Sequence, residues 1–128
     1  YSSAASDVYK RQVVDRLVEA RLVDDALFAG ARVAALKRRG ISAAATRAKL
    51  REKGVDEATT STALLEEGHD EREAARAYAR RRGLGPFRIR DRAERRDRDV
   101  AAMARAGFPV DIAIEIVDGD GSDDSPER

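Results

Sequence analysis

The stretch RRGISAAATRAKLREKGVDEATTSTAL, residues 38–64, decides the fold of this chain. It holds two short helical patterns, and each follows a glycine, an aliphatic residue and a residue type that caps helices. Ser42 and Asp56 are the expected caps, because their side-chain oxygens can accept hydrogen bonds from the first backbone N–H groups of a helix. Gly54 is expected to end the first helix, since glycine adopts left-handed backbone at little cost. The two predicted helices cover about 43–53 and 57–67.

The same pattern of helix-capping and helix-ending residues continues on both sides of this stretch. Asp24 is expected to cap a helix that Gly40 ends, and Asp70, with an acid three residues later, to cap a helix that ends at Gly83. The sequence LGPF is expected to be a loop, because glycine and proline do not readily continue a helix. No stretch alternates polar and apolar residues as a strand does, so we predict an all-α fold with no sheet. The other predicted helices cover about 13–21, 70–82, 91–106 and 110–117.

The sequence also contains an internal repeat. The segment LREKGVDEATTSTAL at 50–64 aligns without gaps with MARAGFPVDIAIEIV at 103–117, and the glycines of the two segments coincide. Each unit then consists of three helices in about 45 residues, a length typical of helical repeats. A unit this small buries little apolar surface alone, so we expect neighbouring units to share faces or to be marginally stable.

Composition excludes several classes of protein. The chain has 128 residues, no cysteine and one histidine, which argues against disulfide frameworks, Cys/His zinc sites and cysteine nucleophiles. No candidate nucleophile has a general base at a suitable spacing, and the sequence contains no glycine-rich phosphate-binding loop. Asp24 and Asp25 have no further metal ligands at a suitable spacing. We therefore expect no enzyme, no cofactor and no metal site. No apolar run reaches the roughly 20 residues that cross a bilayer, which favours a soluble protein of the reducing cytoplasm.

The two ends of the sequence differ from its middle. Residues 1–12, YSSAASDVYKRQ, resemble translated sequencing-adaptor read-through, and we expect them to be a non-native leader. Residues 118–128, DGDGSDDSPER, hold five acids and no apolar side chain, so we expect a disordered acidic tail. The alternative for this tail is a self-masking segment that competes with nucleic acid for basic side chains.

Four motifs in order resemble the RecX family, bacterial modulators of the RecA recombinase. They are LVDDALFAGARV at 22–33, RRGIS followed by TRAKLREKGV at 38–55, DEREAARAYARR at 70–81 and ARAGFPVDIAIEIV at 104–117. The resemblance covers about residues 13–117 and implies a curved, all-helical array of tandem three-helix repeats. Three residues depart from the family pattern: Thr46 replaces an aliphatic residue, Lys49 a common acid and Ala106 one arginine of a basic pair. The implied parts are a remnant of the first repeat at 13–21, the middle repeat at 22–68 and the last repeat at 69–117.

Positive charge is concentrated in two segments, although the net charge of the whole chain is only +1. One is the predicted helix at 43–53, and the other is 72–98, which holds eleven arginines against four acids. Arginine binds phosphates and carboxylates through its planar fork, so these segments suit DNA or an acidic protein surface. Solvated helix faces with ion pairs, such as Asp91 with Arg95, explain the same pattern. The residues that we predict to bind, chosen by charge, are Arg47, Arg51, Arg80, Arg81, Arg88, Arg90, Arg95 and Arg96.

The resemblance implies a non-enzymatic protein that binds RecA filaments and inhibits their activity in recombination and DNA repair. The expected partners are the RecA filament and, weakly and without sequence preference, DNA; we expect no membrane partner and a monomer. Changing Arg88 and Arg90 together to alanine is expected to weaken this inhibition and to leave the helical content unchanged. One alternative is a sequence-specific helix-turn-helix protein whose arginines enter a major groove. Another is a structural adaptor that does not contact nucleic acid.

Overall fold

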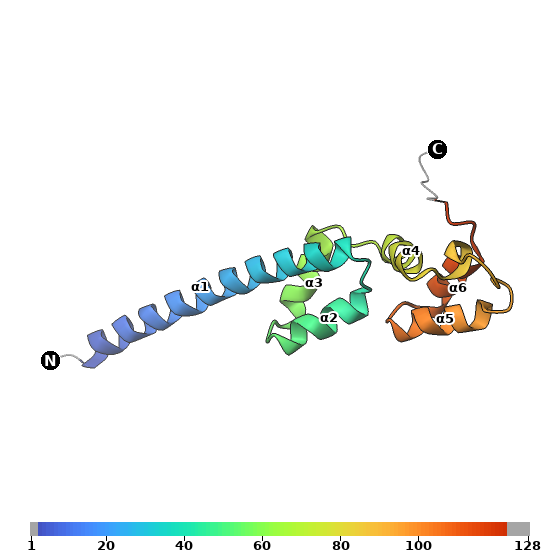
Figure 1. The fold of residues 1–128 in the computed structure, drawn as a ribbon. Helices are drawn as coiled ribbons and strands as arrows, with labels where there is room; N and C mark the ends of the chain where they lie inside the picture. The colour runs from blue at the N-terminus through green and yellow to red at the C-terminus, as the bar shows by residue number, and fades with distance from the viewer. Residues whose placement is uncertain (1–2, 123–128) are drawn as a thin grey trace.

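The described chain is built from helices alone. The computed structural model describes residues 3–122, and this range contains no strand, which confirms the all-α prediction. The helices form two three-helix units, the middle unit (α1 to α3) and the last unit (α4 to α6), that follow one another along the molecule (Figure 1). Their bounds are α1 Ser3–Arg38, α2 Ala43–Glu52, α3 Glu57–Glu66, α4 Glu71–Arg82, the 3₁₀ turn η1 Gly85–Phe87, α5 Arg96–Arg105 and α6 Val110–Asp118.

Three of the predicted caps are confirmed at the starts of α2, α3 and α4. The side-chain oxygens of Ser42, Asp56 and Asp70 each accept a hydrogen bond from the backbone N–H three residues later, at 3.1, 2.8 and 3.1 Å. Each bond satisfies a donor that the first turn of a helix leaves without an intrahelical partner. Local chemistry therefore fixes these three helix starts.

The first helix is longer than predicted. We expected one helix to end at Arg21 and another to begin after Asp24, but α1 is a single helix of 36 residues. A capping residue starts a helix only where something has ended the previous one, and no glycine or proline lies between residues 3 and 29. Asp24 therefore lies inside α1. The predicted ends of the leader, at residue 12, and of the remnant of the first repeat, at residue 21, also lie inside this helix. At 1.5 Å per residue, α1 is about 54 Å long.

The first half of α1 projects away from the rest of the described chain (Figure 1). Residues 4–12 are exposed throughout, and Leu17 and Leu27 keep 65% and 69% of their surface exposed. Only the second half packs, through side chains such as Ala29 and Val33. The predicted leader therefore adds nothing to the described cores. Among the described helices, none combines the length and the apolar character needed to cross a membrane.

Five helix ends share one backbone motif. In each, a glycine with positive φ follows the helix, and the N–H of the next residue donates to a carbonyl five residues before it, at 2.9–3.1 Å. This is the Schellman motif, which usually brings an apolar side chain after the glycine against one in the last turn. The sequence pattern of glycine followed by an aliphatic residue is thus explained. The donor and acceptor pairs are Ile41 with Leu36, Val55 with Leu50, His69 with Leu64, Leu84 with Ala79 and Phe108 with Met103.

The internal repeat is confirmed by matching positions in the two units. Leu50 and Met103 are both fully buried, and the residues that follow their glycines, Val55 and Phe108, are 5% and 3% exposed. Each unit nevertheless has its own core, so the described units share no core, and the alternative, marginal stability, stays a prediction. The reason is that α1 closes the middle unit and α6 closes the last. The cores include Val33, Leu50 and Leu64 in the middle unit and Met103, Phe108 and Val117 in the last.

The two units meet where the loop after α1 approaches α4. A Cβ atom added to Gly40 would lie 2.8 Å from the backbone nitrogen of Tyr78 and 2.9 Å from Cβ of Ala77. Carbon atoms do not approach other atoms so closely, so only a residue without a side chain fits here. Gly40 therefore has two tasks, since it ends α1 with φ +71° and lets the last unit approach.

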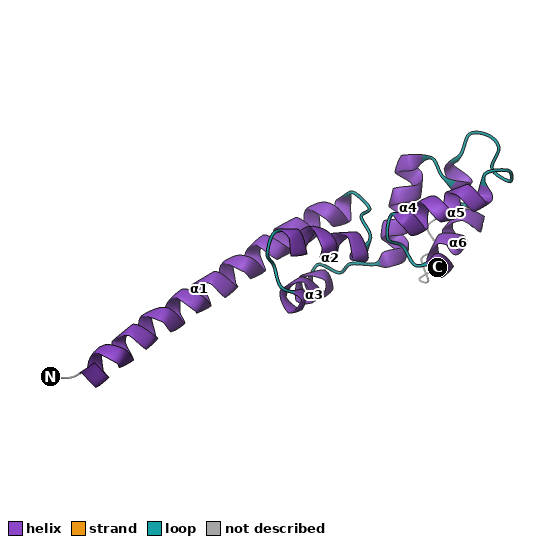
Figure 2. Cartoon of the chain, turned by 90° about the horizontal axis from the view of Figure 1, so that it is seen from below, coloured by secondary structure: helices purple, strands orange, loops and turns teal. Residues whose placement is uncertain are grey.

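Hydrogen bonds between the units supplement this close approach. Ser42 Oγ donates to the carbonyl oxygen of Ala106 at 2.8 Å, while the N–H of Ala43 donates to Oε1 of Glu71 at 3.0 Å. Ser42 therefore caps α2 and joins α2 to the end of α5 at the same time. The junction is narrow, and Figure 2 shows the two units set end to end rather than side against side.

Two predicted boundaries in the last unit are wrong. We expected a helix from residue 91, but α5 begins at Arg96, and Asp91 has a φ of +60° that a helix does not allow. The expected pairing of Asp91 with Arg95 required helical spacing, and their side chains form no ion pair in the described chain. Asp118 closes α6, so the predicted acidic tail begins too early. Residues 123–128 of that tail lie outside the described residues.

The effect of alanine should differ between two of the glycines. Gly40 and Gly54 have φ values of +71° and +84°, so alanine at either position should cost about 1–2 kcal/mol in backbone strain. An added Cβ meets nothing within 4 Å at Gly54 but meets α4 at Gly40. We expect Gly40→Ala to reduce the free energy of unfolding by roughly 1–3 kcal/mol more than Gly54→Ala, because the units must separate. Urea denaturation of both variants measures the difference, and equal losses would contradict the role of this contact.

Candidate functional site

A groove with a volume of about 490 Å³ lies between the two units, and we call it the inter-unit groove. Its walls come from the loop after α1, from α2, and from α4 and α5. No carboxylate is among the described residues that line it. Small residues line the space between the charged side chains, among them Ser42, Ala45, Ala102 and Ala106. The cations of the groove are Arg39, Lys49, Arg81, Arg82 and Arg105.

These cations come from the carboxyl ends of four helices. Lys49, Arg82 and Arg105 lie in the last turns of α2, α4 and α5, and Arg39 directly follows α1. A cation at this end of a helix is stabilised by the unpaired carbonyl groups and by the helix dipole. Each residue is thus explained locally, but the fold brings the ends of α1, α4 and α5 and one face of α2 to the same groove. The result is a local excess of positive charge on a chain whose net charge is +1.

The groove cations also differ from other arginines of the chain in their partners. Arg39, Lys49 and Arg105 form no ion pair within 4 Å in the described chain, whereas Arg72 lies 2.8 Å from Glu115 on the outside of the last unit. Arg81 and Arg82 lie over the ring of Tyr78, 5.9 and 5.4 Å from its centre. Because the groove supplies no carboxylate, its charge is available to an anionic partner.

The predicted pair of arginines on α2 lies away from this groove. Arg47 Nε lies 2.8 Å from Oε1 of Glu57, and Arg51 lies 3.9 Å from the other oxygen of the same carboxylate. Both side chains point to the start of α3 rather than to the last unit. Their side chains are 37% and 70% exposed, so Arg51 is the more accessible of the two.

Arg88 has a structural role that the sequence did not reveal. Its Nε and NH2 groups donate to the two carboxylate oxygens of Asp99 at 2.7 and 2.9 Å, and the N–H of Gly85 donates to the same carboxylate at 2.8 Å. The Asp99 side chain is only 2% exposed. Burial by itself raises the pKa of Asp99, but the bonds from Arg88 and Gly85 outweigh it and hold this pKa below its usual value. The buried pair joins the loop after α4 to α5.

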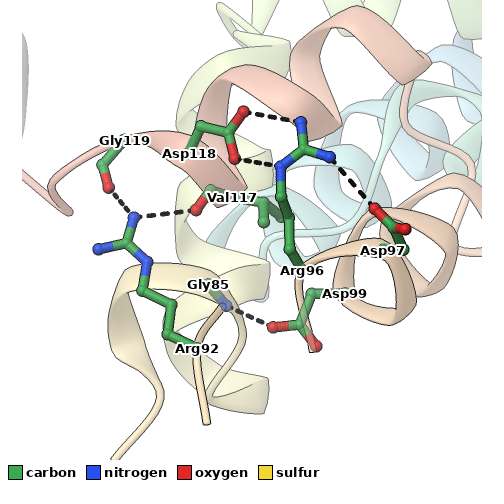
Figure 3. Close-up of polar contacts among 8 residues, drawn as sticks. All are labelled: Gly85, Arg92, Arg96, Asp97, Asp99, Val117, Asp118 and Gly119. Atoms are coloured by element: carbon green, nitrogen blue, oxygen red, sulfur yellow. Dashed lines mark hydrogen bonds and ion pairs between the residues drawn. The ribbon is translucent and has the colours of Figure 1, made fainter. Parts of the chain in front are cut away.

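A second set of polar contacts fastens the start of α5 to the end of α6 (Figure 3). Arg96 donates through Nε and NH2 to both carboxylate oxygens of Asp118, at 2.7 and 2.8 Å, and lowers the pKa of that carboxyl group. Arg92 donates to the carbonyl oxygens of Val117 and Gly119, the first at 3.0 Å. Arginine is suited to this task because its several donors are fixed in one plane. Arg96 therefore holds two helices together.

The remaining predicted residues are spread over different faces. Arg80 lies over the ring of Phe87, 5.0 Å from its centre, and Arg81 lines the inter-unit groove. Arg90 and Arg95 are exposed in the segment before α5. The structure therefore places one of the eight predicted residues, Arg81, in the groove, and it does not gather the eight into one patch.

Most of the groove residues were not predicted from the sequence, although the sequence holds a signal for them. Arg39 and Arg82 directly precede the helix-ending glycines, and Arg105 stands two positions before Gly107. We judged positive charge by its density along the chain, which favoured the segment 72–98. Position relative to the end of a helix would have been the better guide, because equivalent ends of repeated units can meet in space.

Comparison with known proteins connects the middle unit to a family. Residues 24–64 match the model of the second three-helix domain of RecX. A regulatory protein RecX from Myxococcus xanthus (strain DK1622) is 52% identical over 48 residues, which are 36% of this chain and 26% of the relative. The chain therefore spans about a quarter of that relative's length in the alignment. No solved structure matches the chain.

The Arg88 contact leads us to expect a loss of stability rather than unchanged helical content. Arg88→Ala should leave Asp99 as a buried carboxylate without its ion partner, which is a strongly destabilising change. The matched control is Arg90→Ala, an exposed residue in the same segment, which should change the Tm little. Thermal unfolding followed by circular dichroism measures both. Equal Tm values for the two variants would contradict the structural role of Arg88.

The same contact predicts how stability depends on pH. The pKa of Asp99 is lower in the folded chain than the value of about 3.9 expected in the unfolded chain, so the ionised carboxylate favours folding. This stabilisation is complete above about pH 4 and is lost as the pH falls through the folded pKa. We expect the Tm of Asp99→Asn, which is lower at neutral pH, to fall less steeply under acid than that of the unchanged chain. Parallel pH profiles would contradict this assignment.

Proposed function

We propose that this chain, which belongs to the RecX family through its second three-helix domain, regulates the RecA recombinase by binding its filament on DNA. The match of residues 24–64 to the RecX domain is the observation that carries the proposal. Family membership favours a regulatory protein, and we infer that the chain acts by binding and not by catalysis. We infer further that it works in the cytoplasm, as a monomer, and that its binding inhibits the filament.

The architecture supports this proposal in physical terms. A RecA filament on DNA offers protein surface and phosphate backbone close together, so a partner needs a surface that suits both. The inter-unit groove supplies a concentration of cations, while arginines on other faces, such as the exposed Arg90, can meet acidic side chains. We retain Arg47, Arg80, Arg95 and the other predicted arginines as candidate contacts, with the reservation that Arg88 and Arg96 already hold the last unit together.

DNA-dependent ATP hydrolysis by RecA tests the proposal. We expect the rate to fall when the chain is added in substoichiometric amounts, because one molecule bound to a filament affects several RecA subunits. Met103→Asp is the matched control, since a carboxylate at this fully buried position should unfold the last unit and abolish the effect. An unchanged rate with the folded chain would contradict the proposal, and so would equal inhibition by the unfolded variant.

A binding assay on bare duplex DNA separates this proposal from a sequence-specific DNA reader. The filament regulator should bind duplexes of different sequence with equal, weak and strongly salt-dependent affinity. A reader of bases should instead prefer one sequence by on the order of a thousandfold or more. A clear sequence preference would therefore favour the helix-turn-helix alternative.

A further inference from the structure

We propose that the inter-unit groove is a binding site for the sugar–phosphate backbone of single-stranded DNA. The proposal goes beyond filament binding, because it assigns a nucleic-acid contact to one groove that combines residues of both charged segments with Arg39 and Arg105, which lie outside them. The contacting residues are the five groove cations and Tyr78. The binding can be measured with the chain and DNA alone, so it can fail or succeed independently of any effect on RecA.

The first argument is charge without internal compensation. Five cations line one concave surface, and no carboxylate is among its described lining residues. Elsewhere in the described chain, arginines such as Arg47, Arg88 and Arg96 form ion pairs with Glu57, Asp99 and Asp118. Positive charge that is collected in a hollow and left without carboxylates attracts a polyanion strongly, because the low-dielectric walls concentrate the field.

The second argument is the combination of an aromatic ring with arginines. Tyr78 lies half-buried in the wall of the groove, with the ring of Phe108 behind it at a centre-to-centre distance of 5.5 Å. Arg81 and Arg82 lie over the Tyr78 ring, 5.9 and 5.4 Å from its centre. Surfaces that bind single strands combine cations that follow the backbone with aromatic and arginine planes on which bases stack. The ring of Tyr78 thus holds two guanidinium groups in the groove, where their planes can stack on bases and their charges can meet phosphates.

The third argument concerns shape. Small residues line the groove between the cations, among them Ala45, Ala102 and Ala106, so a backbone can approach closely. A flexible single strand can bend into a hollow of about 490 Å³ and turn its bases to the walls, whereas a duplex, with a persistence length of about 150 bp, is too stiff to bend into it. The groove therefore favours unpaired DNA over duplex DNA of the same length.

Charge reversal in the groove gives the decisive test. Arg39→Glu with Arg105→Glu removes two exposed cations of the groove, one from each unit. Arg32→Glu with Arg98→Glu, two exposed residues outside the groove, changes the net charge equally and is the matched control. Fluorescence anisotropy with a labelled oligothymidine of about 20 nucleotides, longer than the typical site size of a single-strand-binding fold, measures the affinity of each. Circular dichroism establishes that both variants are folded.

We expect the groove variant to lose affinity on the order of tenfold or more and the control to lose little. The slope of log affinity against log salt, about −0.7 for each phosphate contacted on a single strand, should become shallower in the groove variant alone. Equal losses in the two variants would reduce the effect to net charge and overturn the proposal. A duplex bound as tightly as the oligothymidine would overturn the preference for single strands.

One outcome would assign the groove to a different partner. If the groove variant keeps its affinity for oligothymidine but no longer inhibits RecA, the groove contacts protein and the DNA assignment is wrong. If it loses oligothymidine binding and inhibition together, the groove acts in filament regulation through DNA. If the unchanged chain binds oligothymidine but never affects RecA, the DNA site stands and the proposed regulatory function fails.

Discussion

The structure depends on how its helices end. Five times, a glycine in the left-handed conformation ends a helix, and the next residue donates its N–H back into the last turn. This motif reverses the chain within a few residues, which lets helices of about ten residues pack against one another. At Gly40 the same motif has a second effect, because the absent side chain allows the loop after α1 to touch α4. The relative position of the two units follows from that contact and from the bond between Ser42 and Ala106.

The charge distribution follows from the same helix ends. Cations near the carboxyl end of a helix are favoured locally, since they neutralise the exposed carbonyl groups. When repeated units are joined through a narrow junction, several helix carboxyl ends face the same groove. Cations that are each favoured at the end of their own helix then form a common surface. Arg39 and Arg82 illustrate this, because both precede a helix-ending glycine yet come from different units. The inter-unit groove is therefore a product of the repeat and not of any single charged segment.

Arginines of the last unit divide into two kinds. Arg88 and Arg96 are held by Asp99 and Asp118, and they replace with polar contacts what a small core of alanines and a few larger side chains cannot supply. Others, such as Arg81, remain at the surface. An arginine-rich segment therefore contains some arginines that hold the fold together and others that are accessible to a partner. Only the contacts of each side chain distinguish the two kinds. The RecX family match lies in the middle unit. We therefore interpret the last unit through the internal repeat, which relates it to the middle unit.

The sequence by itself determined the helical class, the helix caps, the glycine endings and the repeat, because each depends on groups within a few residues of one another. It did not determine the length of α1, since Asp24 can cap a helix but nothing before it ends one. The left-handed Asp91 and the pairing of Arg88 with Asp99 also escaped it, because they depend on residues that meet only after α5 has packed. The tertiary structure alone decided which cations share the groove, because distance along the chain says nothing about which helix ends converge in space.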